Sequence, residues 1–497
     1  MTDFLLVAWV SAMIELRCFA WKFGIGKRWT HGEKLRLLFA GYNGTRNTGS
    51  DVRVQETLRQ IRHVLGHENV DFSVMTQNFD RTQGYFEGSR QVHLPDVYPP
   101  FLFREVHANH GVVACEGSMF KSKFANALTT MMIGSLSLAS AENKLSVAYA
   151  GDAGHMDDLI EWMCARYTRE SLVITRSLES QRLLSGLGVP NELGADTAWT
   201  FEPHPPDYAR NTLRKAGWDE KTPIMVLCPI HPFVWPVRAS LAKYIAAATT
   251  GAYKDSQYRT VYFFESGAEV DRKFDHYVAG YAQAAKAFLQ RHKVFPILVA
   301  MERLDAVACR AIEKEIPGTP IFTSDDYDMF ELVSILRACT YMVSSRYHGI
   351  VTCMPAGVVS RPHSQLGRHV ERCARPRLRR AAHSCFSSLG GDDCGAFLQL
   401  VGGCVARLAR PANTLADGGA RVFALKEMGR TWNALERKVL FCEDHGYAAA
   451  QAQRACRIAF VHRNFEETAR SQIGEGLTVI SLRKRLDKPG DRLVSYL

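Results

Sequence analysis

The chain has 497 residues, which is too long for one ordinary hydrophobic core, so we expect two domains with additional segments. Hydrophobic residues make up 46% and charged residues 23% of the chain, which is typical of a soluble globular protein and excludes global disorder. The net charge is +10, but residues 361–380 hold seven arginines and one glutamate, or +6, so a basic surface spread over the protein is weakly supported and we expect no nucleic-acid partner.

The first 33 residues are an apolar and basic segment. Phe4–Ile14 is apolar but only about half as long as a bilayer-spanning helix, and no basic region precedes it as in a secretory signal. Two interpretations are compatible with it: a helix packed on the protein, or an interfacial helix in peripheral contact with the inner membrane surface. The second would place these aromatic and basic residues at the boundary: Trp9, Phe19, Trp21 and Trp29, with Lys22, Lys27 and Arg28.

Residues 34–205 are predicted to form a first Rossmann-like domain. Short apolar runs predict buried parallel strands, and amphipathic segments between them predict helices. In the first of these segments Val54, Leu58 and Ile61 share one helical face. Alternating strands and helices indicate a parallel sheet covered on both faces. The predicted strands are 35–42, 70–76, 110–117, 144–154 and 171–176.

Residues 206–360 follow a proline-rich linker and repeat the same rhythm, which predicts a second Rossmann-like domain. The fold class is therefore α/β, with two tandem Rossmann-like domains that face each other across a cleft. Ligands bind at the carboxyl ends of the strands in such sheets, so the cleft is the expected site. The predicted strands are 223–232, 260–266, 295–301, 319–324 and 340–345.

The pattern changes abruptly after Ser360. Residues 361–420 are rich in Arg, Cys, Gly and Ser and show poor periodicity, so we predict an irregular stretch. A helical pattern resumes afterwards, and residues 421–497 are predicted to be a helical extension. The abrupt onset is compatible with out-of-frame translation or with a divergent insertion.

The 13 cysteines are scattered, and no two of them form a C-x-x-C pair. The spacing of zinc ribbons and of thioredoxin-like motifs is therefore missing. Scattered single cysteines in a long chain are typical of reduced core thiols, which predicts a cytoplasmic location.

The stretch GYNGTRNTGSD, residues 41–51, joins the first predicted strand to the first helix. It approaches a Walker A spacing, but Ser50 stands where the lysine is required and Asp51 would oppose a triphosphate, which excludes a nucleotide triphosphatase. A flexible backbone, two amides and a helix N-terminus suit a polar ligand, and a plain turn fits the pattern equally well. The candidate substrate-binding residues here are Asn43, Gly44, Asn47 and Gly49.

Charged side chains also follow other predicted strands. Glu116, Arg176 and Arg238 stand at or after strand ends, and we take them as candidate substrate-binding residues. For each of them alone, a solvated turn or a local ion pair is the simpler interpretation. Their shared location favours one cleft, because the carboxyl ends of parallel strands meet at the same edge of a sheet.

The stretch YMVSSRYHGIVT, residues 341–352, places Arg346 and His348 after the last predicted strand, with Ser345 before them as a candidate binding residue. In extended backbone the two side chains point the same way and Tyr347 points into the fold. Arginine suits a phosphate or carboxylate, and histidine exchanges a proton near pH 7, so the pair is a candidate catalytic site for an anionic substrate. The alternative is a histidine hydrogen-bonded at a helix start and an arginine that bridges the domains.

Four motifs in order resemble the polysaccharide pyruvyl transferase family over about residues 35–360. They are the N-x-G-[SD]-[DE] loop at 47–51, the stretch VITRSLESQRLLSGLGV, the stretch GADTAW at 194–199 and the S-x-R-x-H-G motif at 344–349. The last of these is the most specific. The departure from the family pattern begins after residue 360.

The resemblance implies a GT-B-like fold and an enzyme that moves the enolpyruvyl unit of phosphoenolpyruvate onto two hydroxyls of a sugar. The products are a pyruvate ketal and phosphate, with no metal and no cofactor beyond the donor. His348 matches the family's candidate acid, while Arg346, Arg176 and Arg238 would neutralise the donor. The acceptor would be a sugar or a lipid-linked glycan.

Two other functions are compatible with the sequence. One is a GT-B glycosyltransferase that uses a nucleotide sugar. The other is an inactive relative that binds a membrane surface or a polysaccharide, which the N-terminal segment and the basic run at 361–380 would support.

Overall fold

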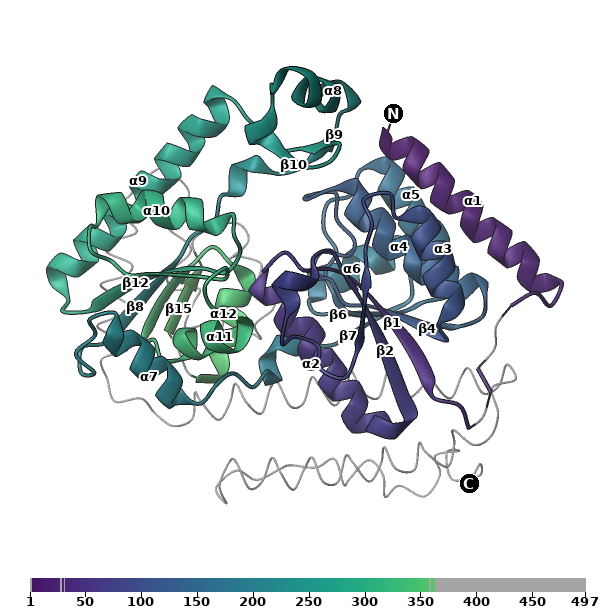
Figure 1. Cartoon of the computed structure of the whole chain (residues 1–497), viewed down its shortest axis with the longest axis horizontal. Helices are drawn as coiled ribbons and strands as arrows, with labels where there is room; N and C mark the ends of the chain where they lie inside the picture. The colour runs from purple at the N-terminus through teal and green to yellow at the C-terminus, as the bar shows by residue number, and fades with distance from the viewer. Residues whose placement is uncertain (1, 27–28, 31, 357–358, 363–497) are drawn as a thin grey trace.

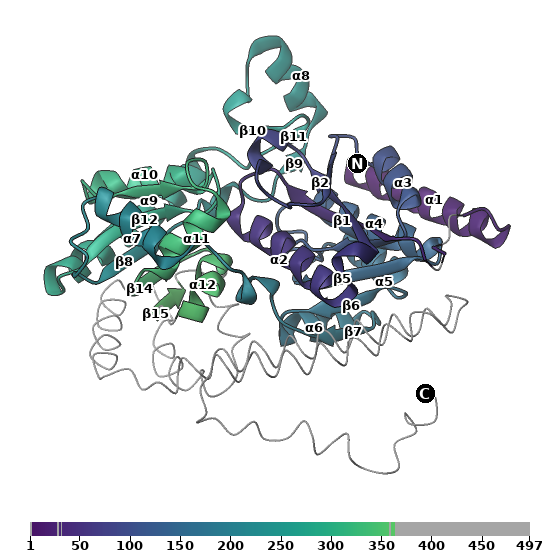
Figure 2. The same cartoon turned by 60° about the horizontal axis from the view of Figure 1, so that its bottom comes forward.

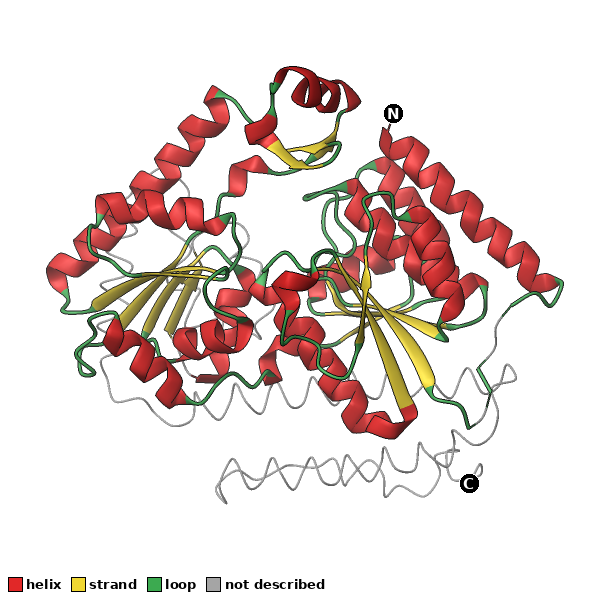
Figure 3. Ribbon diagram, in the orientation of Figure 1, coloured by secondary structure: helices red, strands yellow, loops and turns green. Residues whose placement is uncertain are grey.

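The computed structural model describes residues 2–26, 29–30, 32–356 and 359–362 (Figure 1). Almost all of the predicted irregular stretch 361–420 and the whole predicted extension 421–497 lie outside the described residues. The described chain forms two α/β units, and each is built on its own parallel sheet (Figure 3).

The first sheet has seven parallel strands in the order β3-β2-β1-β4-β5-β6-β7. All five strands predicted for this half are present, and β3 and β7 are additional short edge strands. The chain starts in the middle of the sheet and winds outward in both directions, which is the Rossmann order. The strands are β1 (Leu35–Asn43), β2 (Val70–Thr76), β3 (Arg90–His93), β4 (Gly111–Ala114), β5 (Leu145–Gly151), β6 (Leu172–Thr175) and β7 (Asn191–Leu193).

Helices cover both faces of this sheet, and the alternation along β1 shows how. Leu37 and Phe39 pack on one face with α2, whereas Leu38 and Ala40 pack on the other with α1, α3, α4 and α5. Strands buried on both faces are apolar almost throughout, which is why they were predictable. The helices are α1 (Thr2–Lys22), α2 (Thr48–Leu65), α3 (Pro99–Ala108), α4 (Asn126–Ala141), α5 (Asp158–Tyr167) and α6 (Leu178–Gly186).

The second sheet has five parallel strands in the order β13-β12-β8-β14-β15, again with the first strand in the middle. Two facing Rossmann-like units form the GT-B-like architecture that was predicted (Figure 2). The strands are β8 (Ile224–Cys228), β12 (Phe295–Ala300), β13 (Ile321–Thr323), β14 (Tyr341–Ser344) and β15 (Val359–Pro362). The helices are α7 (Pro206–Lys215), α8 (Leu241–Thr250), α9 (Ala268–Arg291), α10 (Asp305–Glu315), α11 (Met329–Arg337) and α12 (Tyr347–Cys353).

The predicted strand 260–266 is not part of the second sheet, and this prediction was wrong. Its residues belong to a small antiparallel sheet of β9 (Arg238–Ala239), β10 (Gln257–Arg259) and β11 (Tyr262–Phe263). This small sheet reaches the first domain, where Tyr258 stacks on Tyr42 and Arg259 forms an ion pair with Asp96. A short apolar run fits a strand of the second parallel sheet and a strand of the small antiparallel sheet equally well. The sequence pattern therefore cannot distinguish these two locations.

The turn after β1 is held against the neighbouring strand end by its backbone. Asn43 donates a hydrogen bond from Nδ2 to the carbonyl oxygen of Met75 at 3.0 Å, and its own carbonyl accepts one from Gln77. Gly44 has φ +85°, and a Cβ atom there would lie 2.7 Å from the backbone nitrogen of Asn78. Glycine is required at this position both for its conformation and for the space it leaves.

We therefore expect Gly44→Ala to destabilise the protein more than Gly84→Ala. Gly84 has φ +77° with no atom within 4 Å of an added Cβ, so its substitution tests the conformational cost alone, about 1–2 kcal/mol. The clash at Gly44 adds about 1–3 kcal/mol to that cost. Urea denaturation of both variants measures the difference, and equal losses would show that the contact with Asn78 is unimportant.

Candidate active site

A cavity of about 270 Å³ lies between the two domains. Its polar wall is built from residues that follow the carboxyl ends of strands in both sheets. In a Rossmann-like sheet the ligand site lies at this edge, where the strand order reverses. The first domain contributes Asn47, Gly49, Ser50, Glu116, Gly117, Asp152 and Arg176, and the second contributes Met301, Glu302, Arg346, Tyr347 and His348.

Arg346 and His348 both line the cavity, although the backbone differs from the prediction. Arg346 is extended (φ −90°, ψ 126°) and precedes α12, whereas His348 already lies within this helix. Tyr347, which was expected to point into the fold, lines the cavity as well, and the guanidinium carbon of Arg176 lies 3.9 Å from its ring centroid. The helix thus begins at Tyr347, within the stretch that the prediction took as extended.

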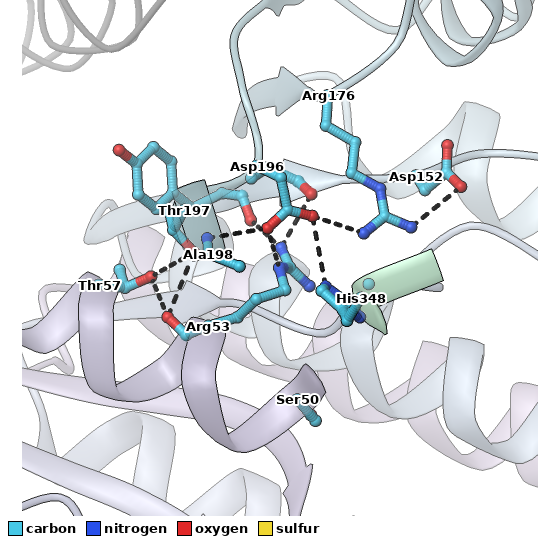
Figure 4. Close-up of polar contacts among 12 residues, drawn as sticks. Ser50, Arg53, Thr57, Asp152, Arg176, Asp196, Thr197, Ala198 and His348 are labelled. Carbon is cyan, nitrogen blue, oxygen red and sulfur yellow. Dashed lines mark hydrogen bonds and ion pairs between the residues drawn. The ribbon is translucent and has the colours of Figure 1, made fainter. Parts of the chain in front are cut away.

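His348 is held between the two domains. Its Nε2 atom lies 3.4 Å from Oδ2 of Asp196, a residue of the first domain (Figure 4). Its ring packs on Gly49 at the start of α2, where an added Cβ would lie 2.3 Å from Nδ1. The side chain of His348 is 15% exposed, so the imidazole is largely shielded while it still lines the cavity.

Asp196 is buried and collects positive partners. It accepts a hydrogen bond from Nη1 of Arg176 at 2.7 Å and one from the backbone nitrogen of Ala198 at 3.0 Å. Nε of Arg53 lies 3.6 Å from its other carboxylate oxygen (Figure 4). Burial disfavours the charged carboxylate, but Arg53, His348 and Arg176 outweigh it and hold the pKa of Asp196 well below its usual range.

A second buried carboxylate, Asp152, follows β5. It accepts hydrogen bonds from Nη2 of Arg176 at 3.3 Å and from Lys121 and Ser180. Arg176 therefore spans two carboxylates, one on each side of its guanidinium group (Figure 4). Burial opposes its charge, but Tyr347 and the two aspartates raise the pKa of Arg176, so it stays protonated.

Arg346 is fixed by acidic side chains of its own domain. Its Nε and Nη2 atoms donate to the two carboxylate oxygens of Asp305 at 2.6 and 2.7 Å, and Nη2 also donates to Glu302. Such a bidentate pair holds the guanidinium plane in one orientation. Arg346 lines the cavity, but its charge is already balanced there.

The N-terminus of α2 also faces the cavity. Asn47 caps this helix by accepting a hydrogen bond from the backbone nitrogen of Ser50 at 3.4 Å, and Oγ of Ser50 donates to Glu116 at 2.8 Å. Burial raises the pKa of Asp51 to about 8, with Arg46 opposing and Glu116 and Glu302 contributing, so this residue is mainly protonated at pH 7. A neutral Asp51 leaves the positive helix N-terminus available to an anion.

Four predicted binding residues are not part of the cavity lining. Asn43 is fully buried and Gly44 contacts Asn78, so both shape the turn instead. Ser345 is buried, and its Oγ atom shares hydrogen bonds with the hydroxyls of Tyr277 and Tyr281.

Arg238 is the fourth of these residues. Its side chain is 76% exposed and pairs with Glu265, because side chains alternate along a strand and Val237 takes the position facing the cavity. The structure thus brings Asn47, Gly49, Glu116, Arg176, Arg346 and His348 together in one cavity.

Three site residues were missed from the sequence: Asp196, Asp152 and Lys121. Asp196 lies in the family motif GADTAW, so this motif could have identified it. The spacing of the motif does not show that Asp196 reaches His348 across the domain boundary. Among the described residues, no group of three His, Cys, Asp or Glu side chains could hold a metal ion.

Another part of the cavity lining is aromatic. Phe124 and Trp235 meet edge to face with ring centroids 5.2 Å apart, and Trp235 meets Tyr258 at 5.7 Å. Tyr42 and Tyr258 stack at 6.4 Å, and all four residues line the cavity. The site therefore combines a charged wall with a wall of flat, largely apolar rings.

Comparison with solved structures found similar chains at low identity. A glycosyltransferase from Rickettsia africae ESF-5 is 11% identical with a TM-score of 0.46, over 83% of this chain and 98% of that chain. A UDP-GlcNAc 2-epimerase from Neisseria meningitidis bound to UDP-GlcNAc is 6% identical with a TM-score of 0.46, over 76% and 92% of the two chains. These values are too low to support a functional comparison.

Comparison with curated proteins found no match. Comparison with protein families found one described as polysaccharide pyruvyl transferase, whose model matches residues 157–360. The matched region includes Arg176, Asp196, Arg346 and His348, and thus both partners of the contact that joins the domains in the cavity. The predicted resemblance is confirmed: residues 157–360 match the polysaccharide pyruvyl transferase family.

Proposed function

We propose that the protein transfers the enolpyruvyl unit of phosphoenolpyruvate to two hydroxyls of a sugar, forming a cyclic pyruvate ketal and releasing phosphate. The observation that carries the proposal is the His348–Asp196 contact at 3.4 Å, which places a proton-exchanging group in the cavity within the family-matched region. A transferase is supported by that match, and the donor and the ketal chemistry are our inference.

The proposed reaction balances as follows. One proton adds to the methylene carbon of the donor, which becomes a methyl group, and the adjacent carbon becomes electrophilic. Two sugar hydroxyls form C–O bonds to that carbon, while its bond to the phosphate oxygen breaks. The hydroxyls release two protons, of which one replaces the proton consumed and the other leaves with phosphate. Because the donor is already activated, the reaction as proposed needs neither a metal nor a redox cofactor.

His348 is the proposed acid for the first proton transfer. Asp196 faces Nε2, which keeps a proton on that nitrogen, and Nδ1 lies beside Gly49 of the cavity wall, where it can exchange a proton with a ligand. Burial, together with Arg176 and Arg53, lowers the pKa of His348 against the opposing effect of Asp196, so the imidazole is neutral at pH 7 without ligand. A bound anion would raise this pKa and load the proton.

The charged wall offers contacts for a donor that carries a phosphate and a carboxylate. Lys121 and Arg176 line the cavity, and the positive N-terminal end of α2 also faces it. Each charge-assisted hydrogen bond would contribute on the order of 1.5–3 kcal/mol. Arg346, which Glu302 and Asp305 already hold, would shape the wall of the cavity.

The aromatic wall suits the acceptor. Trp235 and Tyr258 present ring faces and edges that can pack against the apolar side of a sugar, and the nearby polar groups can bind its hydroxyls. We propose a sugar or a lipid-linked glycan as acceptor and a cytoplasmic location, since the described cysteines are all free thiols.

The direct test incubates the protein with phosphoenolpyruvate and a panel of free, nitrophenyl and lipid-linked sugars. We expect phosphate release that requires both substrates, and a raised thermal midpoint with phosphoenolpyruvate alone, because the donor binds the folded state. Stabilisation by nucleoside diphosphates instead of phosphoenolpyruvate, with no sugar-dependent phosphate release, would contradict the proposal.

We expect His348→Asn to reduce turnover by at least about 100-fold, because general acid–base catalysis typically contributes that much or more. The variant should retain its thermal midpoint, since asparagine keeps a polar group near Asp196. His231→Asn is the matched control: His231 also follows a strand of the second domain, but it stacks on Phe274 and does not line the cavity. Equal activity of the two variants would remove His348 from this role.

We expect Asp196→Asn to shift the pH profile of kcat toward acid. The Asp196 carboxylate favours the protonated imidazole, so its removal lowers the pKa of His348 further. Activity that needs the protonated imidazole is lost as the pH rises through the pKa of His348. The alkaline limb of the profile should therefore move to lower pH by about one pH unit. At pH values above this limb, kcat should fall about tenfold. An unshifted limb with a lower kcat throughout would indicate a purely structural role for Asp196.

A further inference from the structure

Helix α1 is packed against the first domain along one face. Val7, Val10, Met13 and Ile14 are buried in the same core cluster as side chains of α3, α4 and α5. The helix runs along the outside of the molecule, with its N-terminal end on the side where α8 lies (Figures 1 and 2). In the structure α1 thus rests on the first domain, and its opposite face is uncovered.

The outer face of α1 is mainly apolar, with Glu15 on the same face. Its large apolar side chains are Phe4, Leu5, Trp9, Leu16 and Phe19. These side chains are 61%, 59%, 46%, 55% and 61% exposed. At 100° per residue they fall within an arc of about 140° that lies opposite the buried face. The most apolar window of the helix has a mean hydropathy of 1.6, yet only 22% of its residues are buried.

Charged groups near this face are neutralised or lie at its ends. Glu15 is bound by Nη2 of Arg166 at 2.9 Å and by the hydroxyl of Tyr167 at 3.1 Å, both from α5. Asp3 accepts a hydrogen bond from Asn126 at the start of α4. Lys22 closes the helix at its C-terminal end. The face therefore presents apolar side chains and one paired carboxylate, with Asp3 at its N-terminal end and Lys22 at its C-terminal end.

A helix that is apolar on all sides needs cover on all sides, and a large exposed apolar patch marks an interaction site. The chemistry of this patch favours a lipid surface. Phe and Trp side chains dominate the patch. Trp162 of α5, close to Arg166 that binds Glu15, is also 49% exposed. Tryptophan prefers the headgroup level of a bilayer. Because the other face of α1 is packed on the domain, the helix would lie in the plane of the interface.

We propose that the outer face of α1 docks the protein on the surface of an anionic lipid bilayer. The apolar side chains enter the boundary between headgroups and acyl chains, and the basic residues at and after the C-terminal end of α1 in the sequence, Lys22, Lys27 and Arg28, complement the anionic lipids. Docking explains why a solvent-facing helix carries Phe and Trp where polar residues are the norm.

The docked orientation also relates α1 to the cavity, and this step rests on the proposed function. Ala127, Leu128 and Met131 of α4 line the apolar end of the cavity, and Asn126 at the start of the same helix binds Asp3 of α1. The apolar end of the cavity thus lies beside the N-terminal end of the docking face. A lipid-linked acceptor could keep its anchor in the bilayer while its sugar enters the site.

The test is sedimentation of the full chain with vesicles at low salt. We expect binding to vesicles that contain phosphatidylglycerol, weaker binding to pure phosphatidylcholine vesicles, and release by alkaline carbonate, as for a peripheral protein. Trp9→Glu combined with Phe19→Glu should reduce binding at least tenfold. Val307→Glu is the matched control, because Val307 is 46% exposed like Trp9 but lies on α10 of the second domain.

Several outcomes would overturn the proposal. These are a wild-type protein that stays in the supernatant with both vesicle types, or a double variant that binds as well as wild type while keeping its thermal midpoint. A concentration-dependent dimer that the double variant abolishes would show that a second copy covers the face. Resistance to carbonate would show that α1 spans the bilayer. His348→Asn should bind vesicles like wild type, so this test is independent of the proposed transfer reaction.

Discussion

The contact between Asp196 and the groups around it is the constraint on which the site depends. A buried carboxylate is stable only when hydrogen bonds and opposite charges replace the water it has lost. Arg176 and Arg53 supply this from the first domain, and His348 adds a contact from the second. The same network that satisfies Asp196 therefore orients the imidazole, and the two domains share one electrostatic unit.

Two hydrogen bonds from backbone N–H groups also join the two domains near the cavity. The backbone nitrogen of Thr48, at the start of α2, donates to the carbonyl of Met301 at 2.9 Å, and that of Met329 donates to the hydroxyl of Tyr85 at 2.9 Å. Both hydrogen bonds cross between the domains. Together with the packing of His348 on Gly49, they hold the N-terminus of α2 at the cavity wall. The cavity is thus shaped by short-range contacts on both sides, which suits a site that must exclude water.

The sequence predicted those parts of the structure that depend on local pattern. Buried parallel strands are continuous apolar runs, so β1, β2, β8 and β12 were recognisable, and so was the location of Glu116, Arg176 and His348 after strand ends. Features decided through space were not predictable. The pairing of Asp196 with His348 and the packing of the small sheet against the first domain depend on where the second domain sits. The outward direction of Arg238 depends on the register of a strand of two residues.

The charges of the cavity are balanced before any donor binds. Arg176 lies between Asp152 and Asp196, and Arg346 is held by Glu302 and Asp305. An anionic donor would therefore find little uncompensated positive charge. The cavity must gain positive charge when the donor enters. His348 can supply it, because burial and the nearby arginines lower its pKa and keep it neutral until an anion arrives. In the reaction that we propose, uptake of a proton by His348 would then compensate the charge of the donor and prepare the acid.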